Sequence, residues 1–109
     1  MIYYISGPTN LTNTQFLIQY SKPILKILNN NPNCKFITSD DNGTCKMFTD
    51  FLYKYFLNKH IQPHIIKQRA TIYHCGNSPS HNPGFKTIGG FKSIKTRDQI
   101  MLNHSDLKL

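Results

Sequence analysis

Short apolar runs alternate along the chain with longer segments in which apolar residues recur every three or four positions. The short runs are typical of strands buried in a sheet, and the longer segments are typical of helices that bury one face. Four strands are predicted, at residues 2–5, 34–38, 65–74 and 107–109. Three helices are predicted between them, at residues 13–28, 44–58 and 94–104. Strand–helix alternation favours parallel strands and right-handed crossovers. The expected fold is a three-layer, Rossmann-like α/β sandwich with a small, mostly parallel sheet of about four strands, forming one domain over residues 1–109.

Some positions interrupt this pattern. Pro23 lies inside the first helical segment, where proline removes a backbone hydrogen bond, so we expect a kink or a split into two helices. The third strand region is expected to break near Gln68. Residues 75–90 hold four glycines and two prolines and form a predicted loop. At roughly fifteen residues it exceeds the usual connection, which favours a functional or mobile loop. Asp41 or Asn42 is the expected N-cap of the second helix.

The charge balance is strongly basic. The chain has a formal net charge of +8 at pH 7, with eleven Lys and two Arg against five Asp and no Glu. Such an excess ordinarily points to nucleic acid or another polyanion. However, no window holds four consecutive basic residues, and the abundance of Lys, Asn and Ile is what an AT-rich genome encodes. A basic nucleic-acid-binding accessory protein therefore remains an alternative and not the leading interpretation.

No targeting or membrane-spanning segment is recognised. Residues 1–5 are too short for the apolar part of a signal peptide and lack a basic start, so no membrane partner is expected. The three cysteines are an odd number without CxxC spacing, which fits free thiols in the reducing cytoplasm. Cysteines and histidines offer none of the usual zinc-ligand pairs. We assign neither a metal nor a cofactor.

The polar and glycine-containing loops follow predicted strands. In open parallel sheets, ligands bind beyond the carboxyl ends of the strands, beside helix N-termini that carry partial positive charge. Turn chemistry alone explains any one of these loops, but several of them converge on one edge. The candidate ligand-binding residues are Ser6, Gly7, Pro8, Asp40, Asp41, Gly43, Thr44, Gly90, Arg97, Asp98 and Ser105.

Arg97 and Asp98 allow two interpretations. In the functional one, Arg97 donates paired hydrogen bonds to a phosphate, and Asp98 orders the helix start or holds a hydroxyl. In the structural one, Asp98 stabilises the first helical turn and Arg97 is solvated. The adjacent Asp40 and Asp41 would repel a phosphate. They suit ribose hydroxyls, a bridging Mg²⁺ or helix capping.

Two motifs carry a resemblance to a known superfamily. The apolar first strand with Ser6-Gly7-Pro8 is similar to the start of the nucleoside 2-deoxyribosyltransferases. The spacing of Arg97-Asp98, Met101 and Ser105-Asp106 is similar to the helix that precedes the fourth strand in the SLOG nucleotide sensors. The same Rossmann-like superfamily includes the lysine-decarboxylase-like phosphoribohydrolases. The resemblance implies a nucleotide-binding domain, shortened at its C-terminus. Its ligand would be a nucleotide, nucleoside or nucleotide-sugar.

The departures from these families bear on activity. Phosphoribohydrolases carry a Pro-Gly-Gly-x-Gly-Thr-x-x-Glu motif that is absent here, and deoxyribosyltransferases use a glutamate nucleophile, which this chain lacks. A non-catalytic or degenerate relative is therefore the leading expectation. The enzyme alternative is a salvage activity that cleaves N-glycosidic bonds, with Asp41, Asp98 or Asp106 in the role of the glutamate.

The last predicted strand suggests an assembly. Residues 107–109 would lie at the sheet edge and leave apolar surface and backbone groups unpaired. Pairing of this edge with a second copy would cover both, so a homodimer through the terminal strand is expected.

Overall fold

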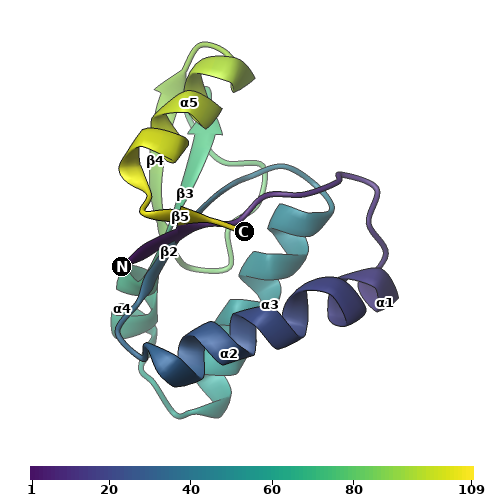
Figure 1. Cartoon of the computed structure of the whole chain (residues 1–109). Coiled ribbons are helices and arrows are strands. Elements are labelled where there is room, and N and C mark those ends of the chain that lie inside the picture. The colour runs from purple at the N-terminus through teal and green to yellow at the C-terminus, as the bar shows by residue number, and fades with distance from the viewer.

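The computed structural model describes all 109 residues and shows an α/β fold built on one parallel sheet (Figure 1). Its strands are β1 (Ile2–Tyr4), β2 (Lys35–Ser39), β3 (Ala70–Cys75), β4 (Lys86–Phe91) and β5 (Leu107–Lys108). The helices are α1 (Asn13–Phe16), α2 (Lys22–Asn30), α3 (Thr44–Asn58), α4 (Pro63–Ile66) and α5 (Ile94–His104). The five strands lie in the order β4-β3-β2-β1-β5, and every neighbouring pair is parallel. The predicted Rossmann-like α/β class is confirmed.

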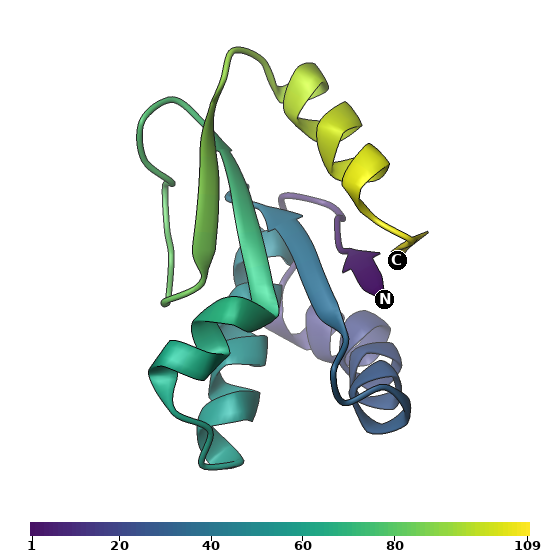
Figure 2. The same ribbon diagram turned by 90° about the vertical axis from the view of Figure 1, so that its left-hand side faces the viewer.

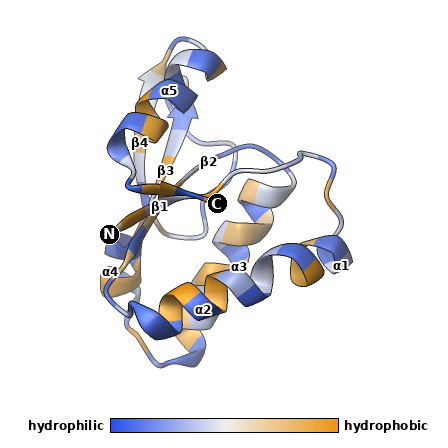
Figure 3. Ribbon diagram, in the orientation of Figure 1, coloured by the Kyte–Doolittle hydropathy of each residue, from blue (hydrophilic) through white to orange (hydrophobic).

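Helices cover both faces of this sheet. Figure 2 shows α5 on one side, with α1, α2 and α3 on the other. Consecutive strand residues point to opposite faces. Ile37 and Tyr73 accordingly pack with Met101 of α5, whereas their neighbours Phe36 and Ile72 belong to the larger core under the other helices. Apolar and polar residues alternate around α2 and α3, as in helices that bury one side (Figure 3).

The direction of the chain reverses once across the sheet. From β1 it proceeds outward through β2 and β3 to β4, and α5 then carries it back over the sheet to β5 on the other side of β1. Right-handed crossovers place helices on opposite faces when the direction reverses. The boundary between β1 and β5 is therefore the topological switch point, where open α/β sheets bind ligands at the carboxyl ends of their strands.

The first helical segment is divided, as the proline predicted. A π-helical turn, Leu17–Ser21, separates α1 from α2. Pro23 lies in the first turn of α2, directly after this π-helical turn. The capping residue of α1 is Thr12, whose side chain accepts from the Gln15 N–H while Gln15 accepts from the Thr12 N–H.

Three local predictions were wrong. Strand β3 begins only at Ala70, since residues 63–69 form α4 and a 3-10 turn that starts at a proline. The predicted loop 75–90 contains β4, an exposed edge strand without the apolar pattern of a buried one. The N-cap of α3 is Gly43 and not Asp41 or Asn42. No side chain caps this helix, and the Asp41 carboxylate bonds to Arg97 instead.

Strand β5 does lie at a sheet edge, as predicted. Leu107 and Leu109 are exposed there. Pairing of this edge in a homodimer stays a prediction. None of the helices is long and apolar enough to cross a lipid bilayer.

Candidate functional site

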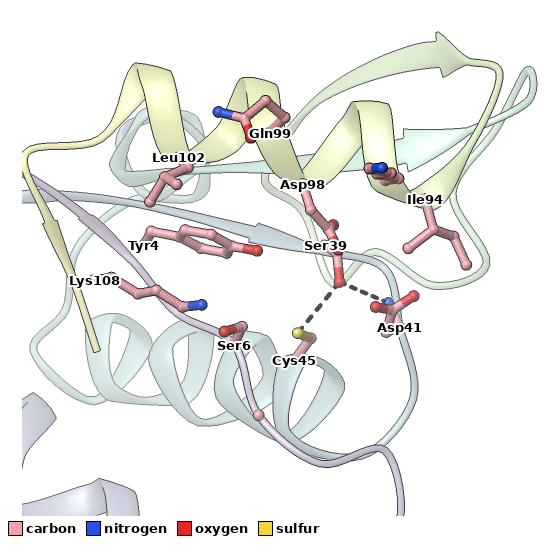
Figure 4. A pocket seen from close by; sticks show the side chains of 12 residues that line it. Tyr4, Ser6, Ser39, Asp41, Cys45, Ile94, Asp98, Gln99, Leu102 and Lys108 are labelled. Carbon is pink, nitrogen blue, oxygen red and sulfur yellow. Dashed lines mark hydrogen bonds between the residues drawn. The ribbon is translucent and has the colours of Figure 1, made fainter.

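A cavity of about 800 Å³ opens at the switch point, between the carboxyl ends of β1 and β2 and the underside of α5 (Figure 4). Strand β1 and the turn after it contribute Tyr4, Ser6 and Gly7, and β5 contributes Lys108. From β2, α3 and the turn between them come Ser39, Asp41 and Cys45, and from α5 come Ile94, Lys95, Asp98, Gln99 and Leu102. Pockets of about 300–1,000 Å³ accommodate small organic ligands. The location is the one that the sheet topology favours.

Beside this pocket, three aspartates surround one buried arginine. The Arg97 side chain is only 2% exposed. Its Nη1 and Nη2 donate to the two carboxylate oxygens of Asp41 at 3.2 and 2.9 Å. Its Nε and Nη2 each lie 3.0 Å from Asp98 Oδ1, and Nη1 donates to Asp40 Oδ1 at 3.4 Å. Four of these contacts are hydrogen bonds, and the contact of Nη2 with Asp98 is an ion pair, so each nitrogen of the guanidinium faces a carboxylate.

The charges of this cluster do not suit a phosphate at Arg97. Burial alone would lower the pKa of Arg97, but hydrogen bonds to Asp41 and Asp98 and their charges overcome this effect and raise the pKa above its ordinary value. Three carboxylates around one guanidinium leave two negative charges in excess. Every guanidinium nitrogen already contacts a carboxylate, which argues against Arg97 as a phosphate clamp. Its burial argues against a solvated side chain. Arg97 instead fixes the positions of carboxylates.

Two of those carboxylates reach the pocket. Asp41 and Asp98 both line it, and their side chains are 36% and 43% exposed. Asp98 Oδ2 makes no hydrogen bond within the protein, since both contacts with Arg97 use Oδ1. An ionised carboxylate only accepts hydrogen bonds. This end of the pocket is built to receive hydroxyl or amino groups.

The other end of the pocket carries a phenol and an ammonium group. Tyr4 is buried, and burial, followed by the negative charge of Asp98 and the nearby Cys45, raises the pKa of its hydroxyl. The hydroxyl therefore stays protonated at neutral pH. Lys108 Nζ lies 5.2 Å from the centre of the Tyr4 ring. Figure 4 shows Lys108 extending into the pocket from the end opposite Asp41.

Hydrogen bonds hold the wall between these two ends in place. Ser39 Oγ accepts from the Asp41 N–H at 3.2 Å and donates to Cys45 Sγ at 3.3 Å. Thr38 Oγ1 donates to the Ile5 carbonyl at 2.9 Å, which ties the end of β2 to the end of β1. The turn after β2 is thereby fixed relative to the residues that face the ligand space.

The loop after β1 packs against the start of α3. The Pro8 carbonyl accepts from the Thr44 N–H at 3.1 Å and from Thr44 Oγ1 at 2.9 Å. Gly43 has φ +75°, and a Cβ there would overlap the Thr9 backbone. A Cβ on Gly7 would overlap the side chains of Thr44 and a neighbouring tyrosine. Close packing within the protein thus explains these glycines, and the start of α3 is partly occupied by the protein's own carbonyl group.

Of the predicted site residues, only Ser6, Gly7, Asp41 and Asp98 line the cavity, and three lie apart from both the cavity and the residues around Arg97 and Thr44. Gly90 belongs to β4, where its N–H donates to the Gly76 carbonyl at 2.8 Å. Ser105 donates to the Leu102 carbonyl at the end of α5. Asp106 accepts from the Ile2 N–H at 2.7 Å, at the amino end of β1. The geometry therefore leaves Asp41 and Asp98, and not Asp106, as carboxylates facing the pocket.

Several lining residues were not identified from the sequence. Residues 94, 98 and 102 share one helical face, as do 95 and 99, so the spacing on α5 was a usable signal. The pairing of Tyr4 with Lys108 across β1 and β5 depends on the sheet order and had no local signal. No cluster of three or more His, Cys, Asp or Glu side chains is arranged to bind a metal ion.

Comparison with known proteins gives no relative for this chain: no protein family, no curated protein sequence and no solved structure matches it. The resemblance to the SLOG and deoxyribosyltransferase superfamily stays a prediction. The fold and the pocket define a Rossmann-like α/β domain with a polar cavity at its switch point.

Proposed function

We propose that this pocket binds a nucleoside, nucleotide or nucleotide-sugar, with sugar hydroxyls at Asp41 and Asp98 and the anionic part near Lys108. The observation that carries the proposal is the polarity of the cavity. Carboxylates fixed by Arg97 lie at one end and the Lys108 ammonium group at the other, and Lys95 of α5 adds a second ammonium group to the lining. A sugar between a base and a phosphate presents hydroxyl donors and an anion in this same arrangement. The SLOG resemblance implies the same class of ligand.

The apolar part of the cavity suits a flat base. Leu102, 47% exposed, lies beside the Tyr4 ring, and Ile94, 59% exposed, lies toward Asp41 (Figure 4). Apolar side chains with a few fixed polar groups are the usual composition of small-molecule sites. Gln99 adds an amide that can donate to and accept from the edge of a base.

The nucleic-acid alternative has weaker support. Lysines lie on α2 and α3 on one face of the sheet and on α5 on the other, as Lys22, Lys46 and Lys95 exemplify. A nucleic-acid interface ordinarily gathers such charges on one face or along one groove. The positive charge of this protein is spread over both layers.

A catalytic version of the proposal would depend on Asp98. Asp98 lines the cavity, and its Oδ2 makes no hydrogen bond within the protein, so this oxygen is available as a carboxylate nucleophile. Attack of Oδ2 on the anomeric carbon of a bound nucleoside would form a glycosyl ester and break the N-glycosidic bond. The departing base would take a proton from water, and a second water would hydrolyse the ester to free sugar and the Asp98 carboxylate. Base release during the binding experiment below reports this activity separately from binding.

The test is an amide ¹H–¹⁵N NMR titration with adenosine, its 5′-monophosphate and a short single-stranded oligonucleotide. We expect the adenosine compounds to shift the signals of Ser6, Ser39 and Gln99. Asp98→Asn should weaken binding about tenfold or more, because a hydrogen bond to a charged group contributes about 1.5–3 kcal/mol. Asp50→Asn, the same change on the exposed side of α3, should leave binding unchanged. Shifts caused only by the oligonucleotide, or an equal effect of both substitutions, would refute the proposal.

A further inference from the structure

The second edge of the sheet is long and unprotected. Strand β4 has six residues, Lys86–Phe91, against two in β5, and it pairs only with β3. Lys86, Thr87 and Ile88 are all exposed. An edge strand of this kind presents a row of unpaired N–H and C=O groups to which another strand can bind. No helix covers it on the outer side (Figure 2).

A groove of about 740 Å³ runs beside the first half of this edge. Its charged lining residues are Lys67 and Lys86, and its polar ones include Asn82 and Thr87. No carboxylate lines it. Ile88 adds an apolar side chain that is 43% exposed.

None of the five aspartates of the protein lines the groove beside β4. Three aspartates surround Arg97, and Asp106 is bonded to the first strand. Asp50, the fifth, lies on α3. The β4 edge is consequently basic and lacks any neighbouring negative charge to neutralise it.

The positive charge of Lys67 and Lys86 determines which kind of strand can pair with the β4 edge. Lysine on an edge strand opposes pairing with another copy of the same edge, because the two copies bring like charges together. The same lysines attract an acidic segment, and cross-strand pairs of opposite charge stabilise a sheet. A nucleic acid would satisfy the lysines but not the alternating backbone donors and acceptors of β4. We propose that the β4 edge and its groove bind an extended acidic segment of a partner protein, which adds a sixth strand to the sheet.

The experiment uses fluorescein-labelled octapeptides of defined sequence. One alternates Glu and Val, one alternates Lys and Val, and one alternates Glu and Pro, which keeps the charge but cannot donate backbone hydrogen bonds at every second residue. Anisotropy measures binding, and ¹H–¹⁵N spectra of the protein locate it. We expect only the Glu–Val peptide to bind and to shift the amide signals of residues 86–91. Lys86→Glu should weaken this binding about tenfold or more, and the equivalent change Lys54→Glu on α3 should not.

Both substituted lysines are exposed, so the variants should keep the dispersed spectrum of the folded protein. Equal binding of the Glu–Val and Glu–Pro peptides would overturn strand addition, since it would show that charge alone is recognised. If Lys86→Glu and Lys54→Glu weakened peptide binding equally, the β4 edge would not be the binding site. Absence of binding, or displacement of the peptide by a single-stranded oligonucleotide that shifts the same β4 amides, would overturn the choice of partner.

Discussion

Arg97 and Asp41 form a two-bond ion pair, Nη1–Oδ1 at 3.2 Å and Nη2–Oδ2 at 2.9 Å, that fastens α5 to the turn after β2. The guanidinium is buried, so water cannot replace the bonds that it makes. Asp98 and Asp40 share the same cation. Arg97 therefore connects α5 to the sheet, the two layers that enclose the pocket.

Removing the positive charge of Arg97 should destabilise the protein. Arg97→Met leaves three carboxylates close together without their partner, and we expect the free energy of unfolding to fall by about 3–5 kcal/mol, as when one member of a buried ion pair is removed. Arg97→Lys keeps the charge but loses the planar fork of donors, so a smaller fall of about 1–3 kcal/mol is expected. Urea denaturation at neutral pH measures both. Lys95→Met, an exposed position on the same helix, should stay within about 0.5 kcal/mol of the wild type. An unchanged stability of Arg97→Met would mean that the cluster is solvated in solution.

Stability should fall at alkaline pH. Burial raises the pKa of Tyr73, and it also raises those of Tyr4 and the Cys34 thiol. Because each pKa is higher in the folded protein, the unfolded chain releases the proton first as pH rises. The contribution of these groups to the free energy of unfolding is complete below their ordinary pKa values, 9.0 for the thiol and 10.0 for the phenols. It is lost as pH rises through the folded-state values.

The contribution of the Tyr73 hydroxyl can be tested with Tyr73→Phe, which removes this titrating group. We expect its unfolding free energy to decline less steeply with pH than that of the wild type above about pH 10, because one titrating group has been removed. Urea unfolding at several pH values between about 8 and 11 measures this slope. The variant also loses the 2.8 Å hydrogen bond to His104 Nδ1, so its stability at neutral pH should be lower from the start. Parallel pH profiles for the two proteins would show that Tyr73 ionises equally readily in both states.

The fold was largely predictable where the apolar pattern is strong. Helices α3 and α5 have the predicted bounds, Thr44–Asn58 and Ile94–His104. Helix α3 buries a regular apolar face, whereas α5 buries little apolar surface and begins at the Ser93 cap, whose side chain accepts from the Thr96 N–H. Strand β4 was missed because it is exposed, so its sequence need not be apolar. The segment before β3 resembles a strand in sequence because isoleucine is common in both strands and helices, but Pro63 favours the first turn of a helix.

The candidate site was predicted only in part. The rule that ligands bind at the carboxyl ends of parallel strands correctly grouped Asp41 with Asp98. That Arg97 would bond to them was not predictable, since residues 41 and 97 meet only when α5 crosses back over the sheet. The position of Asp106 away from the pocket follows from the sequence alone. A residue that directly precedes a parallel strand lies at its amino end, on the opposite edge from the pocket.

A close approach between β3 and β4 makes another position sensitive. The His74 imidazole lies against Gly89, where an added Cβ would overlap the ring. Because His74 is buried, it cannot move aside freely, and Gly89→Ala should cost about 1–3 kcal/mol. A double-mutant cycle with His74→Ala checks the cause, since the cost of Gly89→Ala should shrink in that background. Equal costs in the two backgrounds would assign the loss to the backbone of β4 instead.

The final prediction links the far end of the sheet to the pocket. Asp106 accepts a hydrogen bond from the Ile2 N–H, and β5 otherwise holds only two residues, one of which is Lys108. Asp106→Ala should therefore loosen β5 locally, with a loss of about 0.5–1.5 kcal/mol in overall stability. Hydrogen exchange should accelerate at the Leu109 amide, which bonds to β1 at 2.8 Å. Binding at the pocket should weaken as well, because Lys108 would be held less firmly, even though Asp106 itself contacts no part of the cavity. Asp50→Ala on α3 is the matched control, and unchanged exchange at Leu109 would show that β5 does not depend on the Asp106 bond.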